Sequence, residues 1–151
     1  MMNLGPITDW MVLVADDEPD SIELITEVME YQGASVRSGN NGREALALLE
    51  HFKPTIILTD LSMPEVDGWG VLAKVRKNPD LADVPVIALT AHAMTGDVER
   101  GLAAGFTGYI TKPISPLSLV NDILAQIAAR NEALASEPVK NVLVNKEEAA
   151  A

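Results

Sequence analysis

The 151-residue chain contains no cysteine, and aromatic residues make up only 4% of it. Without cysteine it has neither disulfides nor thiolate metal ligands, and such a composition is typical of a reducing compartment. Basic residues are also few: 11 Lys and Arg stand against 22 Asp and Glu, which gives a net charge of −11. Because a surface that binds nucleic acid needs clustered Lys and Arg, this charge balance argues against nucleic acid as a partner.

Long apolar runs are absent as well. No stretch approaches the roughly 20 uninterrupted apolar residues of a membrane span. Residues 1–10 have neither the basic start nor the apolar middle of a signal peptide. We therefore expect a cytoplasmic protein that does not bind a membrane. The length fits a single domain with a hydrophobic core of its own.

The chain does contain a regular alternation of strand-like and helix-like segments. Short apolar or β-branched runs predict five strands, at residues 11–15, 35–38, 55–59, 86–89 and about 107–111. Helical spacing of apolar residues follows each strand, over about 19–33, 45–52, 68–75, 95–104 and from about 115. Five such units predict an α/β fold, a doubly wound five-stranded parallel sheet with five helices. The usual strand order is 2-1-3-4-5, as in flavodoxin-like folds.

Polar side chains stand where four of the predicted strands end. Asp16 and Asp17 follow the first strand, and Asp60 follows the third. Thr90 follows the fourth strand and Lys112 the fifth. Because the carboxyl ends of parallel strands lie on one edge of the sheet, and strands one and three are neighbours in this order, we expect these groups to converge in one site.

The chemistry of these groups indicates a site for a dication and a phosphoryl group. Mg²⁺ prefers oxygen ligands and usually keeps several waters while it holds a phosphoryl group. Lys112 supplies the compact positive charge that a phosphate needs beside the metal. Asp60, the central carboxylate, can attack phosphorus and form an acyl phosphate. A single Asp at a strand end is more often a turn residue, so the prediction depends on several positions coinciding.

The same residues resemble the signature of the receiver domain of two-component response regulators. They are, in order and at spacings close to those of the family, Asp16-Asp17, Asp60, Thr90-Ala91, Tyr109 and Lys112-Pro113. The segments 61–68 and 88–94 also resemble the loops of the family. The resemblance covers about residues 10–130, which we take as the receiver (response regulatory) domain. We expect residues 131–151 to form a C-terminal tail, either a helix extension or disordered, with a break at 136–138.

For the metal and the phosphoryl group, the resemblance implies specific roles. Asp60 would be the phosphoacceptor and would also contact Mg²⁺. Asp17 would bind Mg²⁺ directly, whereas Asp16 would act through a water molecule. The backbone carbonyl of Ser62 would complete the protein ligands.

The resemblance also implies how the phosphoryl group is sensed. Lys112 would pair with Asp60 and then with the phosphoryl group, and its peptide bond to Pro113 would be cis. Thr90 would act in phosphoryl transfer and, with Tyr109, would form the switch pair. Ser62 and His92 would flank the phosphoryl group.

The function implied by the resemblance is that of a single-domain response regulator in a phosphorelay. It would accept a phosphoryl group from a sensor histidine kinase or a histidine phosphotransfer protein. Too few residues follow the last helix for a DNA-binding or enzymatic output domain, so we expect the signal to leave by phosphorylation-dependent binding of a further protein. We expect no enzymatic activity beyond the transfer and loss of its own phosphoryl group.

Three alternatives are less consistent with the sequence. A phosphatase of the haloacid-dehalogenase type would carry its nucleophile on the first strand, with a second Asp two positions later. A flavodoxin-like cofactor binder would need a Ser-, Thr- or Gly-rich phosphate loop after the first strand, where this chain has Asp16-Asp17-Glu18. A receiver-like module that never takes phosphate is disfavoured because every site residue is present.

Overall fold

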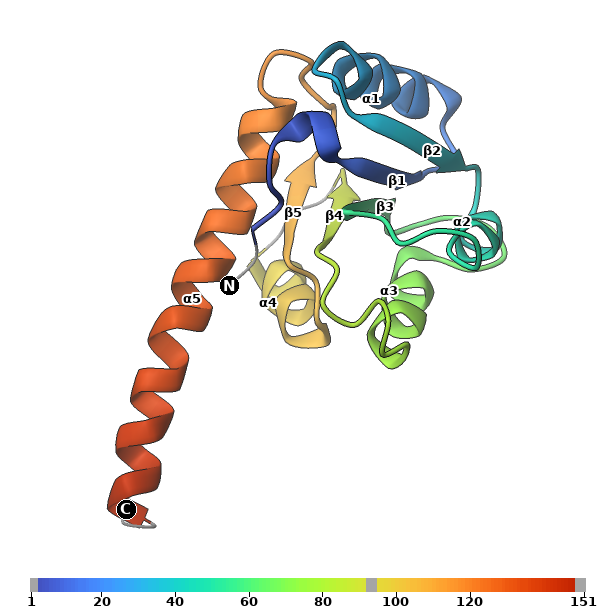
Figure 1. Cartoon of the computed structure of the whole chain (residues 1–151). Helices are drawn as coiled ribbons and strands as arrows, with labels where there is room; N and C mark the ends of the chain where they lie inside the picture. Colours follow the sequence, from blue (N-terminus) through green and yellow to red (C-terminus); the bar gives the residue numbers. More distant parts are fainter. Residues whose placement is uncertain (1–2, 92–94, 149–151) are drawn as a thin grey trace.

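The computed structural model describes residues 3–91 and 95–148 of the chain (Figure 1). In chain order the elements are η1 (Ile7–Asp9), β1 (Met11–Ala15), α1 (Pro19–Tyr31), β2 (Ser35–Gly39), α2 (Gly42–Leu48), β3 (Ile56–Asp60), α3 (Gly68–Lys77), β4 (Val86–Thr90), α4 (Thr95–Ala104), β5 (Gly108–Thr111) and α5 (Leu119–Glu148). Each strand is followed by a helix, as the sequence predicts. The short 3-10 helix η1 is the one described element that the hydrophobic pattern does not indicate.

The strands form one parallel sheet in the order β2-β1-β3-β4-β5, which confirms the predicted topology. The central strand, β3, lies between β1 and β4 and is buried along its whole length. Such burial requires helices on both faces of the sheet, and it explains why the strand is an almost continuous apolar run. The topology also places the carboxyl end of β1 directly beside that of β3.

Two layers of helices cover the sheet. Figure 1 shows α1 and α5 on one face and α2, α3 and α4 on the other. Side chains of β3 alternate between the two cores, with Ile56 and Leu58 in the core of α1 and α5 and Ile57 in the opposite core. The helices contribute fully buried apolar residues such as Ile25 and Ile123 to the first core and Val71 to the second. This packing fixes the strand ends that carry the candidate site.

Several helix ends differ from the predicted positions. α2 ends at Leu48, before the expected Phe52, and α5 begins at Leu119 because residues 116–118 form a turn in which the Ser115 carbonyl accepts hydrogen bonds from two backbone N–H groups. α4 ends as predicted at Ala104, and the following Gly105 has a φ of +117°, which suits glycine.

The last helix is longer than the sequence pattern indicates. α5 continues to Glu148 and projects beyond the sheet (Figure 1), so it includes residues 136–138, where the proline predicts a break. The Ala, Glu and Lys residues on either side are strong helix formers. No helix of the described residues is long and apolar enough to cross a membrane.

Arg76, near the end of α3, connects three parts of the fold through backbone carbonyls. Its Nε and Nη2 donate to the carbonyl of Gly105 at 3.1 and 2.8 Å, and its Nη1 donates to the carbonyls of Val84 (2.6 Å) and Ala82 (3.2 Å). Gly105 follows α4, whereas Ala82 and Val84 lie in the α3–β4 loop. One guanidinium group therefore satisfies carbonyls that the ends of these elements leave without partners.

We expect Arg76→Ala to lower the free energy of unfolding by about 2–3 kcal/mol, because charge-assisted hydrogen bonds are among the stronger ones and their acceptors would be left unpaired. Arg76→Lys should restore only part of this loss, since an ammonium lacks the planar fork. Urea denaturation measures both. Lys77→Ala, which alters the exposed neighbouring cation, is the control and should change stability by less than about 0.5 kcal/mol.

Candidate functional site

Three carboxylates meet at the carboxyl edge of the sheet. Asp16 and Asp17 follow β1, and Asp60 is the last residue of β3. One carboxylate oxygen from each lies within 4.8 Å of the others. Asp16 is fully buried and Asp60 nearly so, whereas Asp17 is exposed. The cluster predicted from the strand ends is therefore present, with one carboxylate open to solvent.

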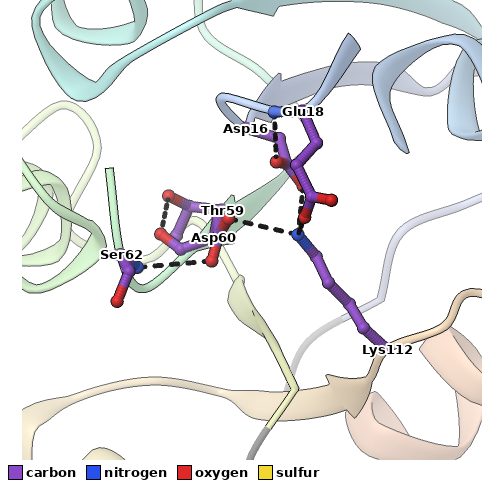
Figure 2. A network of polar contacts seen from close by, with 6 residues as sticks. All are labelled: Asp16, Glu18, Thr59, Asp60, Ser62 and Lys112. Atoms are coloured by element: carbon purple, nitrogen blue, oxygen red, sulfur yellow. Dashed lines mark hydrogen bonds and ion pairs between the residues drawn. The ribbon is translucent and has the colours of Figure 1, made fainter. Parts of the chain in front are cut away.

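Lys112 extends from the end of β5 toward the carboxylates of Asp16, Glu18 and Asp60 (Figure 2). Its Nζ lies 3.0 Å from Asp16 Oδ2, 2.6 Å from Glu18 Oε1 and 3.1 Å from Asp60 Oδ2. Its backbone N–H donates to the carbonyl of Thr90 at 2.7 Å, which holds the residue beside β4. The peptide bond between Lys112 and Pro113 is cis, as the family resemblance implies.

The electrostatics of the site follow from burial and from this single cation. Burial raises the pKa of Asp16 above its ordinary value, and the neighbouring Asp60 raises it further, although the Glu18 backbone N–H and the Lys112 ammonium oppose the shift. For Lys112, burial acts to lower the pKa, but hydrogen bonds to Glu18, Asp16 and Asp60 outweigh it, and the pKa is raised. The ammonium therefore stays charged and compensates only part of the negative charge around it.

The donor set fits a hard dication. Asp16 Oδ2 is buried and, among the described residues, has no hydrogen-bond partner of good geometry, although the Lys112 ammonium lies close to it. The four carboxylates of Asp16, Asp17, Glu18 and Asp60 beside one ammonium leave negative charge that a divalent cation neutralises, and oxygen is the ligand that Mg²⁺ prefers. Asp17 is the exposed member of the cluster, which agrees with a direct ligand. The roles of Asp16 through water and of the Ser62 carbonyl stay predictions.

The loop after β3 approaches the backbone of Asp60 closely. The Ser62 N–H donates to Asp60 Oδ1 at 3.3 Å, and the Gly68 N–H donates to the carbonyl of Leu61 at 3.0 Å. A Cβ atom at Gly68 would lie 2.3 Å from the carbonyl oxygen of Asp60, so only glycine fits there. Asp67 caps α3 by accepting a hydrogen bond from the Gly70 N–H at 2.9 Å. The loop thus fixes the position of the Asp60 carboxylate.

A surface groove gives access to the carboxylates from solvent. It has a volume of about 480 Å³ and is lined by Asp17 and by loop residues that include Ser62, Asp67 and Trp69. Ser62 is exposed, so its small side chain leaves the approach to Asp60 open. A donor group can therefore reach the site from the side of Asp17.

Thr90 and Tyr109, the predicted switch pair, line one small apolar cavity of about 20 Å³ beneath α4. Thr90 ends β4 and is nearly buried, and Tyr109 lies on β5 opposite Ala88 and is half-buried. Trp69 and Phe106 close the cavity with an edge-to-face contact of 5.2 Å between ring centroids. Thr90 and Tyr109 thus line the same cavity, which lies between the strands and α4. His92 and Met94 lie outside the described residues.

Glu18 is a member of the site that the sequence analysis does not predict. It is the N-cap of α1, but its side chain makes no capping bond and instead accepts from Lys112 at 2.6 Å. Its backbone N–H donates to Asp16 Oδ1 at 2.9 Å. The crowding of five acidic residues between 16 and 23 is the signal in the sequence, although it does not identify the partner.

The different exposure of the first two carboxylates leads to a prediction about metal affinity. We expect Asp17→Asn to weaken Mg²⁺ binding by more than about 100-fold, because a direct ligand is lost, whereas Asp16→Asn should cost about 10–100-fold, as expected of a group that acts through water. Titration calorimetry with Mg²⁺ measures both. Equal losses for the two variants would show that the direct ligand is wrongly assigned.

Comparison with known proteins gives matches over most of the chain. The model of the response regulator receiver domain matches residues 12–124. A 14.6 kDa protein of Leptolyngbya boryana is 42% identical over 109 residues, which cover 72% of this chain and 83% of that protein. The polar-differentiation response regulator DivK of Brucella anthropi is 38% identical over 104 residues, 69% of this chain and 85% of DivK.

Other relatives are longer than the matched region. The response regulator Rre1 of Synechocystis is 35% identical over 126 residues, and the match covers 81% of this chain but only 54% of Rre1. Among solved structures, the chemotaxis response regulator CheY4 of Vibrio cholerae superposes with a TM-score of 0.74 at 26% identity, covering 78% of this chain and 98% of CheY4. The chain is thus similar both to proteins of about its own matched length and to longer proteins with additional segments.

Proposed function

The chain belongs to the family of response regulator receiver domains, and on this premise we propose that Asp60 accepts a phosphoryl group from a histidine kinase or a histidine phosphotransfer protein. The observation that carries the proposal is the position of Asp60. Its carboxylate ends the central strand, lies within 4.8 Å of two further carboxylates and is 3.1 Å from the ammonium of Lys112. The groove beside Asp17 opens this position to a donor protein.

In the proposed reaction, a carboxylate oxygen of Asp60 forms a bond to phosphorus as the phosphorus–nitrogen bond of a phosphohistidine breaks. The electron pair of that bond returns to the imidazole, which takes up a proton, and an acyl phosphate remains on Asp60. Bound Mg²⁺ would supply the charge that lets phosphoryl oxygens approach the acidic cluster. Lys112 would turn from the Asp60 carboxylate to a phosphoryl oxygen, and the Thr90 hydroxyl would donate to another.

We propose further that the signal leaves through binding of another protein and that the domain catalyses no reaction besides transfer and loss of its own phosphoryl group. The net charge of −11 supports a protein partner over nucleic acid. One longer relative, RpaA of Synechocystis, is a DNA-binding transcriptional regulator, and this chain matches only 47% of its length. DivK, matched over 85% of its length, is closer in size.

Labelling with a small phosphodonor tests the proposed function. Acetyl phosphate should phosphorylate the chain with Mg²⁺ and should not do so with a chelator, and mass spectrometry of peptides should place the acid-labile group on Asp60. Turnover of a small phosphate ester such as nitrophenyl phosphate should be negligible, which separates a receiver from a phosphatase. Labelling that proceeds without a divalent cation, or that maps elsewhere, would overturn the proposal.

We expect Thr90→Ala and Tyr109→Ala to accept phosphate but to transmit it poorly, because both side chains line the cavity between the strands and α4. Hydrogen exchange of α4 and β5, compared with and without the phosphoryl mimic beryllofluoride, measures the response. A coupling of about 1–3 kcal/mol in the parent chain should fall below about 1 kcal/mol in either variant. Unchanged coupling in Tyr109→Ala would mean that the ring only packs.

A further inference from the structure

A second groove lies at the edge of the sheet opposite to Asp60. It has a volume of about 560 Å³ and is formed where β3, β4 and β5 begin, by residues 53–55, 82–85, 105 and 107. Asn3 and Leu4 from the N-terminal segment and Arg130 and Leu134 from α5 complete the walls. Its volume is within the roughly 300–1,000 Å³ that is usual for small-molecule sites.

The groove is cationic on a strongly acidic chain. Lys53, Arg76 and Arg130 line it, and Asp83 is its one carboxylate. Asp83 is 81% exposed and pairs with Lys53 at 3.5 Å, an exposed contact that holds neither group firmly. Three of the 11 basic residues of the chain thus gather in one groove, although the net charge is −11. This concentration of positive charge favours an anion.

The two guanidinium groups of the groove form no ion pair with a carboxylate of the described residues. No hydrogen bond or ion pair joins Arg130 to another of the described residues, and Arg76 donates only to backbone carbonyls. Those four bonds leave Arg76 with an N–H group to spare, since guanidinium has five. The pKa of Arg76 is lowered chiefly by burial and also by the charge of Arg130, and the charge of Asp83 offsets this only in part. An anion between them would relieve this repulsion.

The other residues that line the groove are suited to the apolar or ring-shaped part of a ligand. Leu4 and Leu134 face the groove from the two terminal segments, and Pro54 and Pro85 line its floor at the strand starts. A mixture of apolar walls and a few polar groups that fix orientation is usual in small-molecule sites. An inorganic anion alone would leave most of this volume unused.

Part of the groove lies outside the range of the family model. The family model ends at residue 124 and begins at residue 12, whereas Asn3, Leu4, Arg130 and Leu134 lie outside that range. The extended α5 adds Arg130 and Leu134 to the groove, and the N-terminal segment adds Leu4. Residues within the range of the family model form the rest of the groove.

We propose that this groove binds a small organic phosphate, with its phosphate between Arg76 and Arg130 and its apolar or ring-shaped part against Leu4 and Leu134. Arg and phosphate match because the planar guanidinium donates two parallel hydrogen bonds to phosphate oxygens. Lys53, which also lines the groove, adds positive charge. The site is independent of Asp60, so its test does not depend on the proposed function.

The test uses the full chain with a chelator present, which keeps metal-bridged phosphate away from the carboxylates. Adenosine monophosphate, glycerol phosphate and inorganic phosphate are titrated, and amide chemical shifts locate any binding. Saturable shifts for at least one organic phosphate should appear around residues 53–55, 82–85 and 105–107. Arg130→Ala and Lys53→Ala should each weaken that binding at least about fivefold, a measurable difference between dissociation constants. Lys74→Ala removes an exposed cation outside the groove and should leave it unchanged.

Three outcomes overturn the proposal. One is that no organic phosphate saturates these shifts at concentrations up to roughly 1 mM, the weak end of useful affinity. Another is that Arg130→Ala binds an organic phosphate as tightly as the parent chain does. This variant retains Arg76 and its contacts with the fold, so it tests the groove without loss of the fold. The third is that a glutamate-rich peptide binds more tightly than every organic phosphate and depends on the same residues, which would assign the groove to an acidic protein segment.

Discussion

Replacing Asp60 by Asn is expected to abolish phosphorylation of the chain while leaving its fold intact. The amide lacks the carboxylate nucleophile but has nearly the same shape. Its one oxygen can take over only one of the two bonds that Asp60 accepts, from the Ser62 N–H on Oδ1 or from Lys112 on Oδ2. The substitution also removes a negative charge that raises the pKa of the buried Asp16. We therefore expect a thermal midpoint equal to or above that of the parent chain, together with complete loss of the acid-labile group.

The measurement is incorporation of phosphate from acetyl phosphate with Mg²⁺, followed by mass spectrometry of the intact chain and by a thermal melt of the same sample. Asp20→Asn, which removes an exposed carboxylate from the first turn of α1, is the matched control and should be phosphorylated normally. Labelling of Asp60→Asn at the level of the parent chain would show that another residue accepts the phosphoryl group. Loss of labelling together with a collapsed melt would mean that Asp60 is needed for the fold.

The position of Asp60 could be predicted because a strand that is buried on both faces has a recognisable sequence pattern. β3 is buried on both faces, so its residues form an apolar run, and the first carboxylate after that run marks the strand end. The strand order then decides which ends are neighbours, and β1 does lie beside β3. Asp16 and Asp17 could be placed with Asp60 for the same reason. The burial of Asp16 and the exposure of Asp17 could not be predicted, because they depend on how the chain turns into α1.

Some contacts between residues far apart in the chain could not be predicted from the sequence. The pairing of Glu18 with Lys112 joins residues 94 positions apart, and Glu18 alone has the sequence context of an ordinary helix start. Arg76 likewise resembles a basic residue in the last turn of a helix, yet its donors reach the carbonyl of Gly105, 29 positions later. Local pattern shows which residues are polar, but only the packed fold shows what lies within their reach.

Replacing Lys112 by Ala is expected to separate metal binding from signalling. The variant loses the ammonium that lies within 3.1 Å of three carboxylates, so Asp16 keeps a buried charge without its partner. We expect the free energy of unfolding without metal to fall by about 2–3 kcal/mol, less than the roughly 3–5 kcal/mol of a fully enclosed pair because the side of Asp17 is open. Mg²⁺ should bind about tenfold more tightly once the competing cation is gone, and should restore much of the stability.

The same variant should take phosphate yet fail to respond to it. Lys112 is the one described residue that joins the end of β5 to Asp60 by an ion pair, and its backbone also holds the end of β4 through the Thr90 carbonyl. Without the ammonium, a phosphoryl group on Asp60 has no charged contact with β5, so hydrogen exchange in α4 and β5 should no longer differ with and without beryllofluoride. Lys74→Ala, an exposed cation on α3, is the control and should respond like the parent chain. A full response in Lys112→Ala would mean that the signal reaches α4 through Thr90 alone, and that the ammonium serves only to balance the charge of the three carboxylates.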